Sequence, residues 1–125
     1  MTKPPTVTYE KYTVVVVPFP FTDKAQTKRR PALVISDPIV FGNLVGHSVM
    51  AMITSAANAP WPLDITIKDL KAAGLPAPSV VRMKLFTLDH RFVLSKIGEL
   101  ASGDREAVKK ALQTLFGSWQ ETHYT

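Results

Sequence analysis

Prolines and glycines divide this chain into short apolar runs, and this division restricts the possible folds more than any other feature of the sequence. The 125 residues include 10 prolines and 6 glycines. The first run, Val14 to Val17, is β-branched throughout and ends at Pro18, which predicts a strand over residues 13–19 with both faces buried. Similar runs predict further strands over residues 32–36, 46–56, 63–67, 79–86 and 92–100.

The last segment has a helical period instead. From Asp104 onward, apolar residues recur at helical spacing, at Val108, Ala111, Leu112, Leu115 and Phe116. Ser102 or Asp104 is expected to cap the start of this helix, and Gly117 to end it. One helical turn is also expected just before Gly74. These elements predict an α+β fold class, mainly β: a small, strongly bent antiparallel sheet or barrel of short strands with a C-terminal helix packed on it.

The size and composition are those of one globular domain. We expect that domain over residues 9–117, with an extended N-terminal tail over residues 1–8 and a C-terminal tail over residues 118–125. The chain has no cysteine, which excludes disulfides and thiolate metal sites. No apolar run approaches the ~20 residues of a membrane helix, and the N-terminus lacks the apolar core of a signal peptide. The expected location is the cytoplasm, with no membrane contact.

The charge balance points to an acidic partner. The net charge is +5 and the pI is about 9.6, which is compatible with RNA, DNA or an acidic protein segment. Cations gather in the polar segment between the first two predicted strands, at Lys24, Lys28, Arg29 and Arg30. Packing gives no reason for them, because a core requires apolar groups and a turn favours Gly, Asn or Asp. They are interpreted as contacts for something negative, and the alternative for each is a solvated loop.

Several motifs in fixed order resemble those of the MazF/PemK-like toxin family. The stretch “VVVVPFPFTD…KRRPALVIS” is similar to the family's opening, in which a strand ending in Pro-Phe is followed by a loop and by Arg-Pro-Ala plus an apolar strand. “AMITS” resembles the family's third strand, and “AGLPAPSVVRMKLFTLDHRFVLSKIGEL” resembles its second half in register. The likeness extends from about Tyr9 to Gly117.

The resemblance implies a toxin of a type II toxin–antitoxin pair, a sequence-specific, metal-independent endoribonuclease that cuts single-stranded RNA, often mRNA. It implies an SH3-like barrel assembled as a homodimer, with no cofactor, and an antitoxin partner that binds through an acidic flexible segment. The family's catalytic arginine, directly before proline, falls on Arg30, and its catalytic threonine, at the end of the third strand, falls on Thr54. The residues expected to bind RNA are Lys24, Lys28, Arg29, Ser55 and Arg82.

The chemistry of metal-free RNA cleavage suits these assignments. The RNA's own 2′-hydroxyl attacks phosphorus, which leaves a 2′,3′-cyclic phosphate and a 5′-hydroxyl, and charge develops on the phosphorane oxygens. Arg30 can hold two of those oxygens and stays charged, so it is a poor general base. Thr54 can donate to a phosphate oxygen or orient Arg30, and otherwise it would satisfy a neighbouring backbone group. The identity of the general base is left open.

The sequence departs from the family pattern at two places. Tyr12-Thr13 stands where family members usually have Gly-Asp or Gly-Glu, and Lys84 stands where some members carry an acid. These departures leave open a catalytically weakened family member. Another alternative is a non-enzymatic toxin similar to the CcdB-like proteins, which bind DNA gyrase. That alternative predicts contacts through the C-terminal helix, with Trp119 beyond it, and needs neither Arg30 nor Thr54.

The remaining aromatic and histidine side chains have two interpretations each. Phe19, Phe21 and Trp61 could stack on bases, but they are better explained as core or dimer-interface residues. His47 is expected at the far end of its strand from Thr54, and His90 on the surface of a turn. No group of histidines and carboxylates has metal-ligand spacing, so no metal site is predicted.

Overall fold

The computed structural model describes residues 7–19 and 28–117, and these form one antiparallel sheet with short helices around it. The strand order is β4-β5-β3-β2-β1-β6. The strands are β1 (Thr13–Phe19), β2 (Lys28–Val34), β3 (His47–Ser55), β4 (Ile65–Thr66), β5 (Ser79–Asp89) and β6 (Ser95–Glu99). The helices are α1 (Asn43–Val45), α2 (Leu70–Ala73) and α3 (Ser102–Phe116), with helical turns η1 (Pro38–Gly42) and η2 (His90–Phe92).

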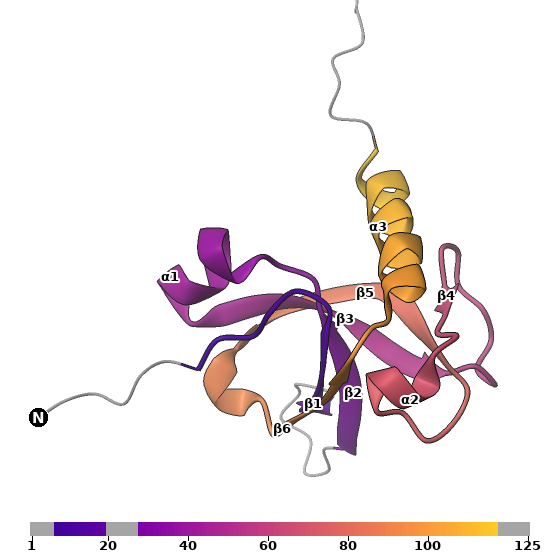
Figure 1. The fold of residues 1–125 in the computed structure, drawn as a ribbon, viewed down its shortest axis with the longest axis horizontal. Helices are drawn as coiled ribbons and strands as arrows, with labels where there is room; N and C mark the ends of the chain where they lie inside the picture. The colour runs from indigo at the N-terminus through magenta and orange to yellow at the C-terminus, as the bar shows by residue number, and fades with distance from the viewer. Residues whose placement is uncertain (1–6, 20–27, 118–125) are drawn as a thin grey trace, which may run out of the picture.

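The sheet curls because its register shifts at two places. The β1–β6 pairing slips between Val14 and Val15, and the β3–β5 pairing slips between Ala51 and Met52. Extra residues in one strand of a pair bend the sheet and increase its twist. Figure 1 shows the curled sheet, with α1 and α2 at opposite sides of the view and α3 rising beside β5. The predicted fold class is confirmed: a bent antiparallel sheet with a C-terminal helix.

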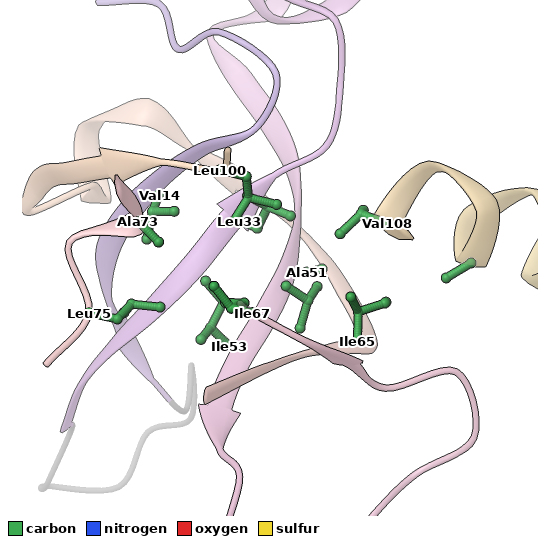
Figure 2. Close-up of a cluster of buried hydrophobic side chains, with 12 residues drawn as sticks. Val14, Leu33, Ala51, Ile53, Ile65, Ile67, Ala73, Leu75, Leu100 and Val108 are labelled. Atoms are coloured by element: carbon green, nitrogen blue, oxygen red, sulfur yellow. The ribbon is translucent and has the colours of Figure 1, made fainter. Parts of the chain in front are cut away.

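The two faces of the sheet carry separate apolar clusters. On one face of the sheet, alternating strand residues pack with residues of α2 and α3 in the larger cluster. Figure 2 shows side chains from the strands and from α3 converging there. This face, the helix face, is marked on the strands by Val14, Leu33, Ala51, Ile53 and Val81.

The opposite face, the pocket face, carries the smaller cluster. It consists of Val15, Val17, Ala32, Val34, Met50 and Leu88. The predicted burial of the first strand on both faces is confirmed, since Val14, Val15 and Val17 are fully buried. The alternation of side chains along each strand therefore decides which polar residues share the pocket face.

Helix α3 begins differently from the prediction. Its N-cap is Ala101, which makes no side-chain capping bond, so neither Ser102 nor Asp104 caps it. Asp104 is instead buried and accepts hydrogen bonds from the backbone N–H groups of Lys68 and Asp69, at 3.0 to 3.1 Å. Asp104 is close in sequence to the helix start, where a carboxylate can cap, but it satisfies donors from a segment 35 residues away.

Several boundaries also differ from the sequence expectations. Strand β2 starts at Lys28, so three of the predicted loop cations lie on the strand, and β5 continues through Asp89 where a turn was expected. β4 and β6 are shorter than predicted, and the helical segment over residues 38–45 was not anticipated. The single turn ending at Gly74 is confirmed as α2.

His90 lies in the interior and not on the surface as expected. The residue is 6% exposed, and its Nδ1 lies 2.7 Å from the carbonyl oxygen of Val7. A carbonyl only accepts, so Nδ1 donates, and in the neutral ring Nε2 then accepts from the Ser48 hydroxyl at 2.7 Å. Tyr9 meets the ring edge-on at 5.1 Å. The histidine thus holds the start of the described chain against β3, away from the site below.

Candidate functional site

The strand registers bring the predicted catalytic residues to one face. Ala32 pairs with Met52 and Val34 with Met50, so continuing this register by two residues directs Arg30 toward Thr54. On the other side of β3, Met52 pairs with Arg82 of β5. Paired residues of neighbouring strands share a face, so Arg30, Thr54 and Arg82 all belong to the pocket face.

These side chains surround a concave pocket of about 200 Å³. Its lining comes from four strands and from the loop over residues 56–64, namely Phe19, Arg30, Met52, Ile53, Thr54, Asn58, Trp61, Arg82 and Lys84. Three of the lining residues are cations and none is an acid, so the pocket has the electrostatic character of an anion site.

The strand geometry distinguishes the two adjacent arginines. Arg30 pairs with Val17 and lies on the pocket face, where it is half-buried and lines the pocket. Arg29 pairs with Pro18, belongs to the opposite face, is exposed and does not line the pocket. Consecutive residues of a strand point to opposite faces of the sheet, so Arg30 and Arg29 cannot both point to the pocket face. Arg30 is therefore the arginine with access to a bound group.

Thr54 is held by a side chain that follows it in the chain. The Asn58 amide Nδ2 lies 2.6 Å from Thr54 Oγ1 and donates to it across the turn after β3. A hydroxyl accepts and also donates, so this contact leaves the hydroxyl proton of Thr54 for a second acceptor. Both residues line the pocket beside Arg30.

Arg82 is fixed by an ion pair at the wall of the pocket. Its Nε and Nη2 donate to the two carboxylate oxygens of Asp64 at 3.2 and 2.9 Å, and Nη2 also donates to the Ala59 carbonyl oxygen at 2.8 Å. The hydrogen bond from Arg82 is the main reason why the pKa of Asp64 lies below its ordinary value, and the same bond raises the pKa of Arg82. Both groups are therefore charged at neutral pH.

Aromatic rings accompany the cations of the pocket. The Arg82 guanidinium carbon lies 4.9 Å from the centroid of the Trp61 ring, and Lys84 Nζ lies 5.1 Å from that of Phe19. Cations at these distances are attracted to the ring faces. Cations interleaved with aromatic rings are typical of surfaces that bind single-stranded nucleic acid.

The sequence model of PemK-like, MazF-like toxins of type II toxin–antitoxin systems matches residues 10–116. The chain belongs to this family. The resemblance seen in the motifs is thereby confirmed. No curated protein sequence matches the chain significantly.

Solved structures show the same fold. MazF from Deinococcus radiodurans is similar, with 23% identity and a TM-score of 0.69, covering 90% of this chain and 99% of that one. MazE–MazF from the same organism gives 23% identity, a TM-score of 0.70 and coverages of 89% and 98%. An endoribonuclease in complex with its cognate antitoxin from Mycobacterial species gives 16% identity, a TM-score of 0.66 and coverages of 90% and 98%. At these identities the likeness establishes the MazF-like fold.

Of the other residues predicted to bind RNA, the three that the structure describes, Lys28, Arg29 and Ser55, do not line the pocket. Lys28 shares the face of Arg30 but is exposed and does not line the pocket. Ser55 is exposed on the other face of β3, and its hydroxyl accepts from the Ala57 backbone N–H at 3.1 Å. Lys24 and Phe21 lie outside the described residues. His47 is at the far end of β3, as expected.

Sequence reasoning missed Asn58 and Asp64. A polar residue four positions after a strand-end threonine is a local signal, and it could have identified Asn58. Asp64 has no such signal, since it meets Arg82 only because β4 pairs with β5. Within residues 7–19 and 28–117, no three His, Asp or Glu side chains are grouped so that they could hold a metal ion. No helix in those ranges is both long and apolar enough to cross a membrane.

Proposed function

We propose that this toxin-family protein is a sequence-specific, metal-independent endoribonuclease that cuts single-stranded RNA, with mRNA as its substrate in the cytoplasm. The observation that carries the proposal is the meeting of Arg30 and Thr54 in one cationic pocket with aromatic walls. A phosphodiester is the anion that fits such a pocket, because its charge suits the cations and its neighbouring bases suit the rings.

In the proposed reaction the 2′-oxygen of the RNA loses its proton and attacks the adjacent phosphorus. The bond to the 5′-oxygen breaks, and that oxygen takes a proton, so the products are a 2′,3′-cyclic phosphate and a 5′-hydroxyl. Arg30 stabilises the negative charge that develops on the phosphorane oxygens, and a guanidinium can hold two of them at once. The hydroxyl of Thr54 accepts a hydrogen bond from Asn58 and donates its own proton to an oxygen of the same phosphate. This is the third contact to that phosphate.

The remaining residues of the proposal bind the RNA on either side. Arg82 lines the pocket, and Lys28 and Arg29 lie exposed on the strand that carries Arg30. Cations at such positions hold flanking phosphates and make binding depend on salt. Ser55 and Lys24 stay in the proposal as further RNA contacts. The proposed assembly is a homodimer.

The experiment that tests the proposal is cleavage of a long single-stranded RNA by the purified protein in EDTA, followed by mapping of the product ends. Discrete cuts with 5′-hydroxyl ends, lost in Arg30→Ala and in Thr54→Ala, are the expected result. A folded protein that cuts nothing would contradict it. Binding to purified DNA gyrase would then distinguish a CcdB-like toxin from an inactive family member. The end of α3 is the surface to vary there, since Leu115 and Phe116 are exposed.

Asn58→Asp should slow RNA cleavage by about 10-fold or more, because the new carboxylate cannot donate to Thr54 and repels the phosphate. The change should appear in the single-turnover rate at saturating protein. Asn43→Asp is the matched control, since Asn43 is exposed on α1 and does not line the pocket. Equal rates for Asn58→Asp and the unmodified protein would show that the hydrogen bond from Asn58 to Thr54 does not contribute to the reaction.

The cognate antitoxin is proposed to cover Arg30 with an acidic segment. Antitoxin recovered by co-purification should block RNA cleavage when it is bound, and Arg30→Ala should weaken its binding by about 10-fold or more. Titration of the antitoxin into both proteins by calorimetry, with cleavage measured in parallel, provides the test. If a saturating antitoxin left cleavage unchanged, it would bind elsewhere on the toxin.

A further inference from the structure

An exposed tryptophan at the wall of the pocket is not explained by packing. Trp61 is 44% exposed, although it lines the same pocket as Arg30 and Thr54. It lies in the loop between β3 and β4, outside both apolar clusters of the sheet. A large aromatic side chain exposed in a cationic pocket is a candidate binding surface.

The backbone around Trp61 is held on both sides. Its own N–H donates to Asp64 Oδ2 at 2.9 Å, and the Asp64 N–H donates back to the Trp61 carbonyl oxygen at 3.3 Å. Pro60 and Pro62 flank it and restrict the backbone further. Leu63 has a φ of 67°, a left-handed conformation that non-glycine residues rarely adopt. Strain of this kind tends to occur where a loop has to present a side chain in one position.

The ring of Trp61 is held as well as its backbone. The Arg82 guanidinium lies 4.9 Å from the ring centroid and is itself bound to both oxygens of Asp64. The carboxylate and guanidinium side chains are only 12% and 11% exposed. Asp64 therefore fixes the backbone of Trp61 directly and its ring through Arg82. Among the described residues, Asp64 is the only acid that is hydrogen-bonded to a cation of the pocket. Its ion pair with Arg82 neutralises its charge.

We propose that Trp61 is a stacking platform for an RNA base beside the scissile phosphate, and that the Asp64–Arg82 pair positions it. The inference rests on the proposed ribonuclease function and extends it to substrate binding. A ring already ordered by Arg82 loses little further freedom when a base stacks on it. Stacking has no strict sequence requirement, because every base has a π-face.

The first test is binding of non-cleavable RNA. The probes are short homopolymers of adenosine, uridine, cytidine and guanosine with methylated 2′-oxygens, which removes the attacking hydroxyl. Trp61→Ala and Trp61→Leu should both weaken binding by roughly 5- to 150-fold, whereas Trp61→Phe should retain most of the affinity. Trp61→Leu is the matched variant, since it is apolar and lacks a π-face.

The second test reads the tryptophan itself. The chain has two tryptophans, so Trp119→Phe leaves Trp61 as the sole source of indole fluorescence. Saturating RNA should quench that emission. Asp64→Asn and Arg82→Lys should reduce the quenching and raise Kd for RNA. The control pair is Asp89→Asn and Arg91→Lys, an ion pair at the other end of β5, where neither change should alter either readout.

The outcomes separate this inference from the function on which it rests. Full affinity in Trp61→Ala or Trp61→Leu, with cleavage by the unmodified protein intact, would overturn the stacking platform alone. Unmodified protein that neither binds nor cuts RNA would overturn both. Loss of self-association or of antitoxin binding in Trp61→Ala, with unchanged RNA affinity, would overturn the inference and assign Trp61 to a protein interface.

Discussion

Replacement of Arg30 by alanine should lower the rate of RNA cleavage by about 10²- to 10³-fold, the usual effect of removing one group that stabilises transition-state charge. The loss should appear in kcat, because the charge on the phosphorane oxygens exists only in the transition state. Single-turnover cleavage of one RNA at saturating protein gives this rate directly. Arg30 is half-buried at the pocket end of β2 and outside both apolar clusters, so the variant should keep its fold.

Two further variants make the Arg30 result specific. Arg30→Lys keeps the charge but cannot hold two oxygens in a planar fork, so it should recover only part of the rate. Arg29→Ala removes a cation from the other face of the same strand, and should raise KM with little change in kcat. A loss of kcat in Arg29→Ala, together with normal cleavage by Arg30→Ala, would contradict the prediction. It would mean that Arg29 stabilises the transition state and that Arg30 only binds RNA.

The sequence was sufficient for the fold class because its signals were local. Each element is indicated by residues within it or next to it: β1 by its valines, α3 by the helical spacing of its apolar residues, and α2 by the glycine that follows it. The boundaries that were wrong depended on tertiary pairing. The residue types of Lys28 and Arg29 do not by themselves favour a strand. They are extended because they pair with residues of β1. The position of Asp104 near the start of α3 predicts a cap, because nothing in the sequence marks its long-range donors, the backbone N–H groups of Lys68 and Asp69.

The candidate site divides in the same way. The family motif identified Arg30 and Thr54, but only the two-residue period of β2 and β3 explains why these and not Arg29 and Ser55 reach the pocket. The resemblance to the family predicts Arg82 only as a basic residue that binds RNA. Its bonds to Asp64 and Ala59, and its place over Trp61, depend on the pairing of β5 and on a loop of defined shape. Such arrangements have no signature within a short window of sequence.

Gly98 on β6 should be intolerant of any side chain, with Gly98→Ala lowering the free energy of unfolding by about 3 kcal/mol or more. A Cβ at this position would lie 2.5 Å from the Ala72 carbonyl oxygen and 2.6 Å from that of Ala73, so α2 and β6 would have to separate. Backbone atoms cannot rotate away as a flexible side chain can. The pairing of Gly98 with Val14 would carry the disturbance into β1, whose last residue, Phe19, lines the pocket.

Gly103→Ala is the matched control for this prediction. A Cβ there meets nothing within 4 Å, and the residue lies in the first turn of α3. Alanine should therefore stabilise the protein slightly, by about 0.4 to 1 kcal/mol. Urea denaturation of both variants measures the difference. Equal stability of Gly98→Ala and the unmodified protein would mean that α2 packs less closely on β6 than the structure has it. RNA cleavage by the same variant would show whether β1 still positions the pocket.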